Sequence, residues 1–304
     1  MSCSSKPRLG HRLPWLAGLA LLTIVGCAGA EPPAARPVPA EPVLTGPVPV
    51  LQDGADARLP LDPFLLTPPQ VDQVTRAHRA LLAQCAGRFG LTAPPTTAAP
   101  TGPRTLNERR YGITDPGRAA AAGYRLSAHE PNQPPARSTT PRADPTLLAV
   151  LSGDGPRIVH GQPVPAGGCY QETRRRLHGA DRTVAEEMLA QRLSHDSYDQ
   201  SGQDPRVQAV AGLWSQCMRA HGYDYRGPLD PPADRRFRGQ VSAAEIATAA
   251  ADIACKRKNN LVGIWFAVES SYQLPQIAAN RAGLERIRRT NIAELGVARS
   301  LGIR

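Results

Sequence analysis

The sequence lacks the short motifs that identify common enzyme chemistry. It has no Gly-x-Ser-x-Gly turn for a nucleophilic serine, and Gly153-Asp154-Gly155 is a turn without the strand-loop-helix context of a phosphate site. The histidines are scattered and no two cysteines have metal-ligand spacing, so neither a metal nor a cofactor is expected. His195 and Asp196 are neighbours that point apart on a helix, which predicts a solvated helix end and not a catalytic pair. The sequence therefore assigns no catalytic residue.

Long hydrophobic runs are missing too, apart from one near the start. Residues 13–25 are mostly apolar and follow a leader that contains Lys6, Arg8 and Arg12. This run is too short to cross a bilayer comfortably, and it has the charge and length of a signal peptide over residues 1–26. We therefore expect the protein to be exported.

The apolar run ends in Ile24-Val25-Gly26-Cys27, which resembles the lipobox of bacterial lipoproteins. The resemblance implies that Cys27 is diacylated, carries fatty acids such as palmitate, and holds the protein on the outer side of the cell membrane. Two acyl chains give a stable anchor where one is marginal. The alternative is ordinary cleavage after Ala30, at the small-residue site Ala28-Gly29-Ala30, which would leave the protein freely secreted.

The positive charge of the chain comes almost entirely from arginine. The formal charge of +10 falls to +7 without the three basic residues of the leader, and lysine remains only at Lys256 and Lys258. Scarce lysine with abundant Ala, Pro and Gly is typical of a GC-rich, actinobacterial genome, so part of this charge is compositional. The expected partners are the membrane, envelope proteins and anionic wall polymer. Nucleic acid is not expected, because no motif combines aromatic residues with arginine.

Proline is concentrated after the lipobox. Residues 28–66 are rich in proline and have no helical period, which predicts an extended, solvated tether. We therefore divide the chain into the lipidated N-terminus and tether (27–66), a first helical half (67–200) and a second helical half (201–304). About 278 residues remain after the leader, enough for one large or two modest domains.

Two predicted helices share the same start and the same end. Thr67-Pro68 and Asp204-Pro205 each place a capping residue before a proline, and an apolar stripe follows in both. The stripes carry Cys85 and Cys217, each five residues before a glycine that ends the helix. We interpret the match as a weak internal duplication, and a shared capping pattern is the alternative. The stripes are Val71, Val74, His78, Leu81, Leu82, Cys85 and Phe89 in the first, and Val207, Val210, Ala211, Trp214, Cys217 and Met218 in the second.

Another helix is predicted to begin at Ser242, which forms a capping box with Glu245. Its stripe runs to Pro275, where the helix should stop or kink, and Cys255 lies beside the stripe. Cys85, Cys169, Cys217 and Cys255 are an even set in a chain expected to be exported, which predicts two disulfides. Pairing Cys217 with Cys255 would join two consecutive helices. By elimination, and by analogy with this pair, Cys85 is then paired with Cys169. The sequence alone allows three connectivities.

The first half is less regular. Residues 92–142 are rich in Pro, Thr, Ala and Arg and are predicted to form long irregular excursions. Asp144-Pro145 opens a short capped helix ending near Gly153, and the alternative is a small hairpin of residues 146–151 with residues 157–160. Gly167-Gly168-Cys169 leads into residues 170–177, and Thr183 with Glu186 opens a further helix to about residue 193.

The C-terminal segment after Pro275 continues as a basic amphipathic helix. Ile277, Leu284, Ile287 and Leu295 form its apolar side, and the other side carries Arg281, Arg286, Arg288, Arg289 and Arg299. One interpretation is a terminal helix packed on the domain with a solvated arginine face. The other is a helix that contacts anionic lipid or a protein partner.

The densest polar and aromatic stretch is residues 214–225, Trp-Ser-Gln-Cys-Met-Arg-Ala-His-Gly-Tyr-Asp-Tyr. It resembles a pattern of exported actinobacterial lipoproteins that have no assigned function: a helix with Cys-Met, a glycine four residues later and aromatics in the next loop. Arg110-Tyr111-Gly112-Ile113 and Gly167-Gly168-Cys169 give a similar impression. The pattern supplies no catalytic residue, and we expect Tyr223 and Tyr225 to pack over a disulfide.

These patterns predict a mainly α-helical, disulfide-stapled domain with long proline-rich excursions, anchored outside the cytoplasm by lipid on Cys27. The first functional hypothesis is a non-catalytic binding or accessory module of the cell envelope. The second is an envelope hydrolase, in which carboxylates such as Glu172, Glu186 or Glu187 would converge with a histidine in a pocket.

Overall fold

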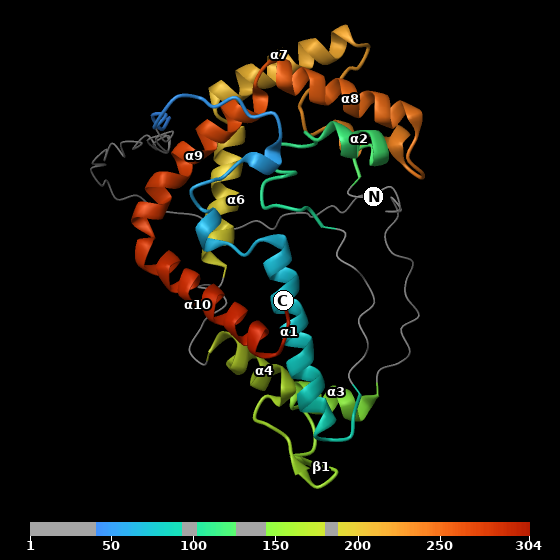
Figure 1. Ribbon diagram of the computed structural model, residues 1–304, viewed down its shortest axis with the longest axis vertical. Helices are drawn as coiled ribbons and strands as arrows, with labels where there is room; N and C mark the ends of the chain where they lie inside the picture. Colours follow the sequence, from blue (N-terminus) through green and yellow to red (C-terminus); the bar gives the residue numbers. More distant parts are fainter. Residues whose placement is uncertain (1–40, 93–101, 126–143, 180–187) are drawn as a thin grey trace, which may run out of the picture. The chain divides into compact units, whose positions relative to one another are not determined.

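A computed structural model describes residues 41–92, 102–125, 144–179 and 188–304 of the protein (Figure 1). The predicted fold class is confirmed: these residues are mainly helical and contain two disulfides. Residues Glu41–Arg304 form one compact unit. The predicted signal peptide, Cys27 and residues 28–40 of the tether lie outside the described residues.

The elements follow one another as helices with a single small hairpin. The hairpin pairs β1 (Ile158–Val159) with β2 (Gln162–Pro163) in antiparallel register. Among the described residues, none of the helices is long and apolar enough to span a membrane. The α-helices are α1 (Pro68–Gly87), α2 (Pro116–Ala122), α3 (Pro145–Ser152), α4 (Gly168–His178), α6 (Leu189–Gly202), α7 (Pro205–Ala220), α8 (Ala243–Lys258), α9 (Leu261–Ala279) and α10 (Arg281–Ser300), and the short 3₁₀ turns are η1 (Gly54–Asp56), η2 (Asp62–Phe64), η3 (Pro231–Ala233) and η4 (Arg235–Phe237).

The predicted helix caps form at the expected residues. Thr67 and Gln70 form a capping box at the start of α1, and the Asp204 carboxylate accepts from the Arg206 backbone N–H at the start of α7. Asp144 caps α3 in the same way, so residues 146–151 form the short helix and not a strand paired with residues 157–160. The hairpin that does form pairs residues 158–159 with residues 162–163. Each of these side chains satisfies a backbone donor that a helix start leaves free.

The ends of α1 and α7 close alike, but their disulfide partners differ. Gly90 and Gly222 have positive φ, and the next backbone N–H donates to the carbonyl five residues earlier in both helices. Cys85 of α1 is joined to Cys169 in the first turn of α4, whereas Cys217 of α7 is joined to Cys255 near the end of α8. These are the two pairings favoured from the sequence. The partner helices do not correspond, so the described likeness goes no further than the two capped helices.

The predicted single helix from Ser242 to Pro275 is wrong in two respects. It is two helices, because Asn260 adopts a left-handed conformation (φ 48°) between α8 and α9. The Asn260 amide donates to the Pro49 carbonyl at 2.9 Å and so ties this break to the N-terminal segment. Pro275 does not end the helix, because α9 continues to Ala279. The capping box is half correct: Ser242 accepts from the Glu245 backbone N–H, but the Glu245 carboxylate accepts from the Tyr124 backbone N–H instead.

The last part of the predicted tether belongs to the folded unit. Ala57, Leu59 and Leu61 are buried, and the Leu61 backbone N–H donates to Gln273 of α9 at 3.0 Å. Proline prevents regular helix here, but alternate apolar residues still give the segment surface to bury. Residues 41–66 therefore belong to the folded unit and are not an extended tether.

The predicted excursion over residues 92–142 is also wrong where the structure describes it. Residues 102–125 contain α2, which packs on α8, and Tyr111 and Ile113 are buried. Asn107 and Glu108 are buried as well, and Asn107 donates to the Ala57 carbonyl at 3.2 Å. The polar composition of this segment suggested an exposed loop, but these polar side chains are buried because they are paired by hydrogen bonds.

The two predicted sequence halves interpenetrate. C-terminal α10 packs on α1 and α4, and α6 packs on α9 (Figure 1). Leu81 and Leu177 from the first half share a cluster with Ala298 from the second. The boundary at residue 200 falls inside α6, which runs to Gly202 and not to residue 193, and the helix start expected at Thr183 lies outside the described residues.

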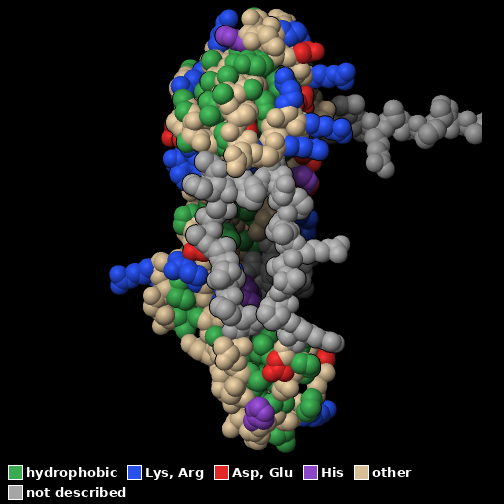
Figure 2. Space-filling model, turned by 90° about the vertical axis from the view of Figure 1, so that its right-hand side faces the viewer, with side chains coloured by type: hydrophobic (Ala, Val, Ile, Leu, Met, Phe, Trp, Pro, Cys, Tyr) green, Lys and Arg blue, Asp and Glu red, His purple; other side chains and the backbone are tan. Residues whose placement is uncertain are grey.

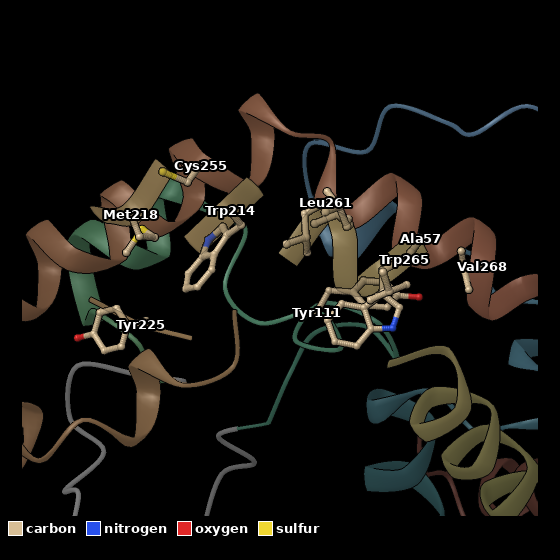
Figure 3. Packing of buried hydrophobic residues seen from close by; sticks show 12 residues of the cluster. Ala57, Tyr111, Trp214, Met218, Tyr225, Cys255, Leu261, Trp265 and Val268 are labelled. Atoms are coloured by element: carbon tan, nitrogen blue, oxygen red, sulfur yellow. The ribbon is translucent and has the colours of Figure 1, made fainter. Parts of the chain in front are cut away.

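The largest core cluster is built around Trp214 of α7 and Trp265 of α9. Figure 3 shows Met218 and Tyr225 beside Trp214, near Cys255, and Tyr111 against Trp265, where the ring centroids are 5.4 Å apart. Tyr225 is buried in this cluster and Tyr223 packs against it, as expected for aromatics next to the disulfide. The predicted stripe of α7 is thus largely internal, whereas Val71 of the α1 stripe is exposed.

Candidate functional site

A cavity of about 660 Å³ opens between α6 and α10. Its other walls come from the segment before α1, the start of α1, residues 106–110 and the end of α4. This volume is typical of a small-molecule site. The apolar lining is Phe64, Leu65, Leu66, Val71, Leu106 and Ile287, and the polar lining is Asn107, Arg110, His178, Gln191, Ser194, His195, Tyr198, Asn291 and Glu294.

One polar group of the cavity is a histidine held by a buried carboxylate. His178 is the last residue of α4, and its Nδ1 lies 2.6 Å from Oε1 of Glu294 on α10. Glu294 is 4% exposed, whereas the His178 side chain is 24% exposed. Because Nδ1 is engaged by the carboxylate, Nε2 is the ring nitrogen left to meet a ligand or move a proton.

A second polar group is Arg110, which separates the cavity from the core. Its Nε donates to both carboxylate oxygens of Glu269 at 2.9 Å, its Nη2 donates to the Ser194 carbonyl at 2.7 Å, and its guanidinium lies over the Tyr198 ring. Burial lowers the pKa of Arg110, but the hydrogen bonds and charge of Glu269 outweigh it and raise the pKa. Burial also raises the pKa of Tyr198 to about 12, so its hydroxyl stays protonated and able to donate.

The core behind Arg110 fixes this wall. Glu269 is fully buried and also accepts from the Tyr111 hydroxyl and the Gln273 amide, both at 2.9 Å. Burial, followed by the Glu269 charge, raises the pKa of Tyr111 well above its usual value. A buried carboxylate with this many donors is satisfied without water. Arg110 is therefore held in place at the cavity wall by a buried hydrogen-bond network.

The carboxylates predicted for a hydrolase do not form a described cluster with histidine. Glu172 pairs with Arg88 at 2.6 Å, and Glu186 and Glu187 lie outside the described residues. His195 and Asp196 are exposed as predicted, but they lie in the middle of α6 and not at a helix end. The Nε2 atom of His195 is 3.4 Å from Asp199 Oδ2. His195 nevertheless lines the cavity.

The His178–Glu294 pair was not predictable from sequence patterns, because 116 residues separate its members. One feature of the sequence does indicate that Glu294 has a buried partner. Glu294 lies on the buried side of α10 with Leu284, Ile287 and Ala298, where a carboxylate requires a partner. The identity of that partner depended on tertiary packing of α4 on α10.

One metal-like group occurs among the described residues: Cys217, His221 and Cys255 have ligand atoms within 4.8 Å of one another. The two sulfurs are bonded to each other as a disulfide, so neither is a thiolate ligand. The cavity is therefore the better candidate for function.

Comparisons of this chain with models of protein families, with curated proteins and with solved structures gave no match. The function is accordingly inferred from the chemistry of the cavity and of the surface.

Proposed function

We propose that the protein is an exported, lipid-anchored cell-envelope protein whose helical domain binds a small amphiphilic molecule in the cavity between α6 and α10. The observation that carries the proposal is the cavity itself, about 660 Å³ in volume, with apolar side chains and a limited set of polar groups. The apolar part of a ligand would cover Phe64, Leu106 and Ile287. Its polar group would meet His178 and Tyr198.

The proposal is tested by blocking the cavity. The Gln191→Trp substitution places an indole at its wall and should reduce one-to-one binding of the fluorescent amphiphile anilinonaphthalene sulfonate at least tenfold, as titrated by fluorescence. Gln200→Trp is the matched control, because Gln200 is on the same helix, is also exposed and lies outside the lining. Equal binding by both variants, each with an unchanged melting temperature, would place the ligand site elsewhere.

The anchor is tested separately by the mass of the protein in the membrane fraction. The mature chain should begin at Cys27 and carry a diacylglycerol adduct, and Cys27→Ala should release the protein or leave it unprocessed. An unmodified chain that begins at Glu31 would instead show secretion after ordinary cleavage.

A second candidate function, an envelope hydrolase, is favoured by the buried Glu294 that orients His178. In this arrangement Nε2 would take a proton from a water that attacks a bound ester, and Glu294 would stabilise the resulting imidazolium. Glu294→Gln should then abolish turnover of a p-nitrophenyl ester while probe binding persists. If the wild-type protein binds the probe but hydrolyses no ester faster than this variant, the site only binds.

A further inference from the structure

The solvent-facing side of α10 is strongly basic. Its five arginines, Arg281, Arg286, Arg288, Arg289 and Arg299, are all exposed. The helix has only two carboxylates: Glu285 is 2.9 Å from Arg288, and Glu294 is buried on the opposite side beside His178. None of the described carboxylates lies within ion-pair distance of Arg281 or Arg289. The charges of Arg281, Arg289 and Arg299 are therefore not paired with any carboxylate of the described residues.

An apolar side chain lies within this basic face. Arg281, Arg288, Ile292 and Arg299 follow one another at intervals of seven, four and seven residues, so they form one row along the helix. Ile292 is 55% exposed. Exposed arginines flanking an exposed isoleucine are typical of a helix that lies on a membrane surface, where arginine meets phosphate and the apolar side chain enters the headgroup layer.

The helices packed against α10 add to the charge. Helices α1, α4 and α10 together contain ten arginines and four carboxylates, and Arg79, Arg175 and Arg176 of α1 and α4 are exposed. The net charge of these three helices, which touch one another, is therefore +6 (10 − 4), against +7 for the whole exported chain. On the face of the protein in Figure 2, too, basic side chains are more widespread than acidic ones.

We infer that the arginine face of α10 docks on anionic phospholipid of the membrane that carries the anchor. This inference rests on the proposed lipid anchor at Cys27. Only residues 28–40 separate Cys27 from the folded unit, and a chain of that length reaches at most about 45 Å. The domain is therefore held within reach of the headgroups, where the basic face gains more from a charged bilayer than from more distant wall polymer.

The test uses protein without the acyl chains, so that only the surface is measured. Every described element lies within Glu41–Arg304, so a chain that begins at Ala28 lacks none of them and should fold. It should co-sediment with vesicles of equimolar phosphatidylglycerol and phosphatidylcholine, but not with phosphatidylcholine alone, and high salt should release it.

The triple variant Arg281→Gln, Arg289→Gln, Arg299→Gln should weaken binding to the anionic vesicles on the order of 100-fold, about fivefold for each charge. The matched control, Arg226→Gln, Arg235→Gln, Arg238→Gln, removes the same charge from exposed positions between α7 and α8 and should bind nearly as well as the wild type.

Equal weakening in both triple variants would show that net charge, not the α10 face, drives binding, and would overturn the inference. Binding to isolated anionic wall polymer without binding to the vesicles would also overturn it. Neither result depends on whether Cys27 is acylated, which the mass of the membrane-bound protein decides independently.

Discussion

Replacing Lys256 with methionine should destabilise the fold by about 3 to 5 kcal/mol, because it leaves a buried carboxylate without its cation. Lys256 is 1% exposed, and its Nζ lies 3.1 Å from Asp252 Oδ2 and 3.1 Å from the Ile113 carbonyl. Asp252 is fully buried and also accepts from the Trp214 indole N–H at 2.9 Å. Burial lowers the pKa of Lys256 and raises that of Asp252, so each charge depends on the other.

The loss should be measured by urea unfolding, with Lys258→Met as the control. Lys258 is on the same helix but exposed, so its substitution should change the free energy of unfolding by less than about 0.5 kcal/mol. Adding Asp252→Asn to Lys256→Met should recover part of the loss, because a neutral amide can still accept from Trp214. A loss as small as that of Lys258→Met would mean that the pair contributes no more than a surface ion pair.

The effect of pH on Lys256→Met has a definite sign. Burial already raises the folded-state pKa of Asp252 above its unfolded value. In Lys256→Met, Asp252 has lost its cation, so this pKa should rise further. A raised folded pKa favours the folded state at low pH and loses this effect as the pH rises through it. The destabilisation should therefore be larger at about pH 7 than at about pH 5, when each is measured against the wild type at the same pH.

Local features of the fold could be predicted from the sequence because they depend on neighbouring residues. The helix starts at Thr67, Asp144 and Asp204 each follow from a capping side chain before a proline. The closing turns at Gly90 and Gly222 follow from glycine's access to positive φ. The choice of Cys217 with Cys255 needed only that consecutive helices pack together.

Features that join distant residues were not predictable from one sequence. Asn260 breaks the expected long helix because its amide binds Pro49, 211 residues away. Arg110 forms a wall of the cavity through Glu269, 159 residues away. Asparagine and arginine are both common on protein surfaces, so neither residue stands out in the sequence. Only the packing shows which partner forms its hydrogen bonds. The cavity was missed for the same reason, since five separate segments supply its lining.

Removing the Cys85–Cys169 disulfide should cost about 4 to 5 kcal/mol in the loop-entropy model, because it joins residues 84 apart in the chain. The bond lies in a small cluster with Phe89, Val150 and Leu151, which is separate from the main core around Trp214. Its removal in a Cys85→Ala, Cys169→Ala variant should therefore act first on α3 and α4. We expect amide hydrogen exchange to accelerate in those two helices while α7 and α8 stay protected.

The second disulfide provides the matched control for this prediction. Cys217 and Cys255 are 38 residues apart, so their double alanine variant should lose slightly less stability, about 4 kcal/mol, and exchange should accelerate in α7 and α8 instead. The two variants thus have similar energetic cost but opposite patterns of exchange. If both accelerate exchange uniformly through α1–α10, the small cluster unfolds only with the main core and has no stability of its own. If the first variant alone loosens α4, His178 loses its position beside Glu294, and probe binding in the cavity should weaken in that variant but not in the other.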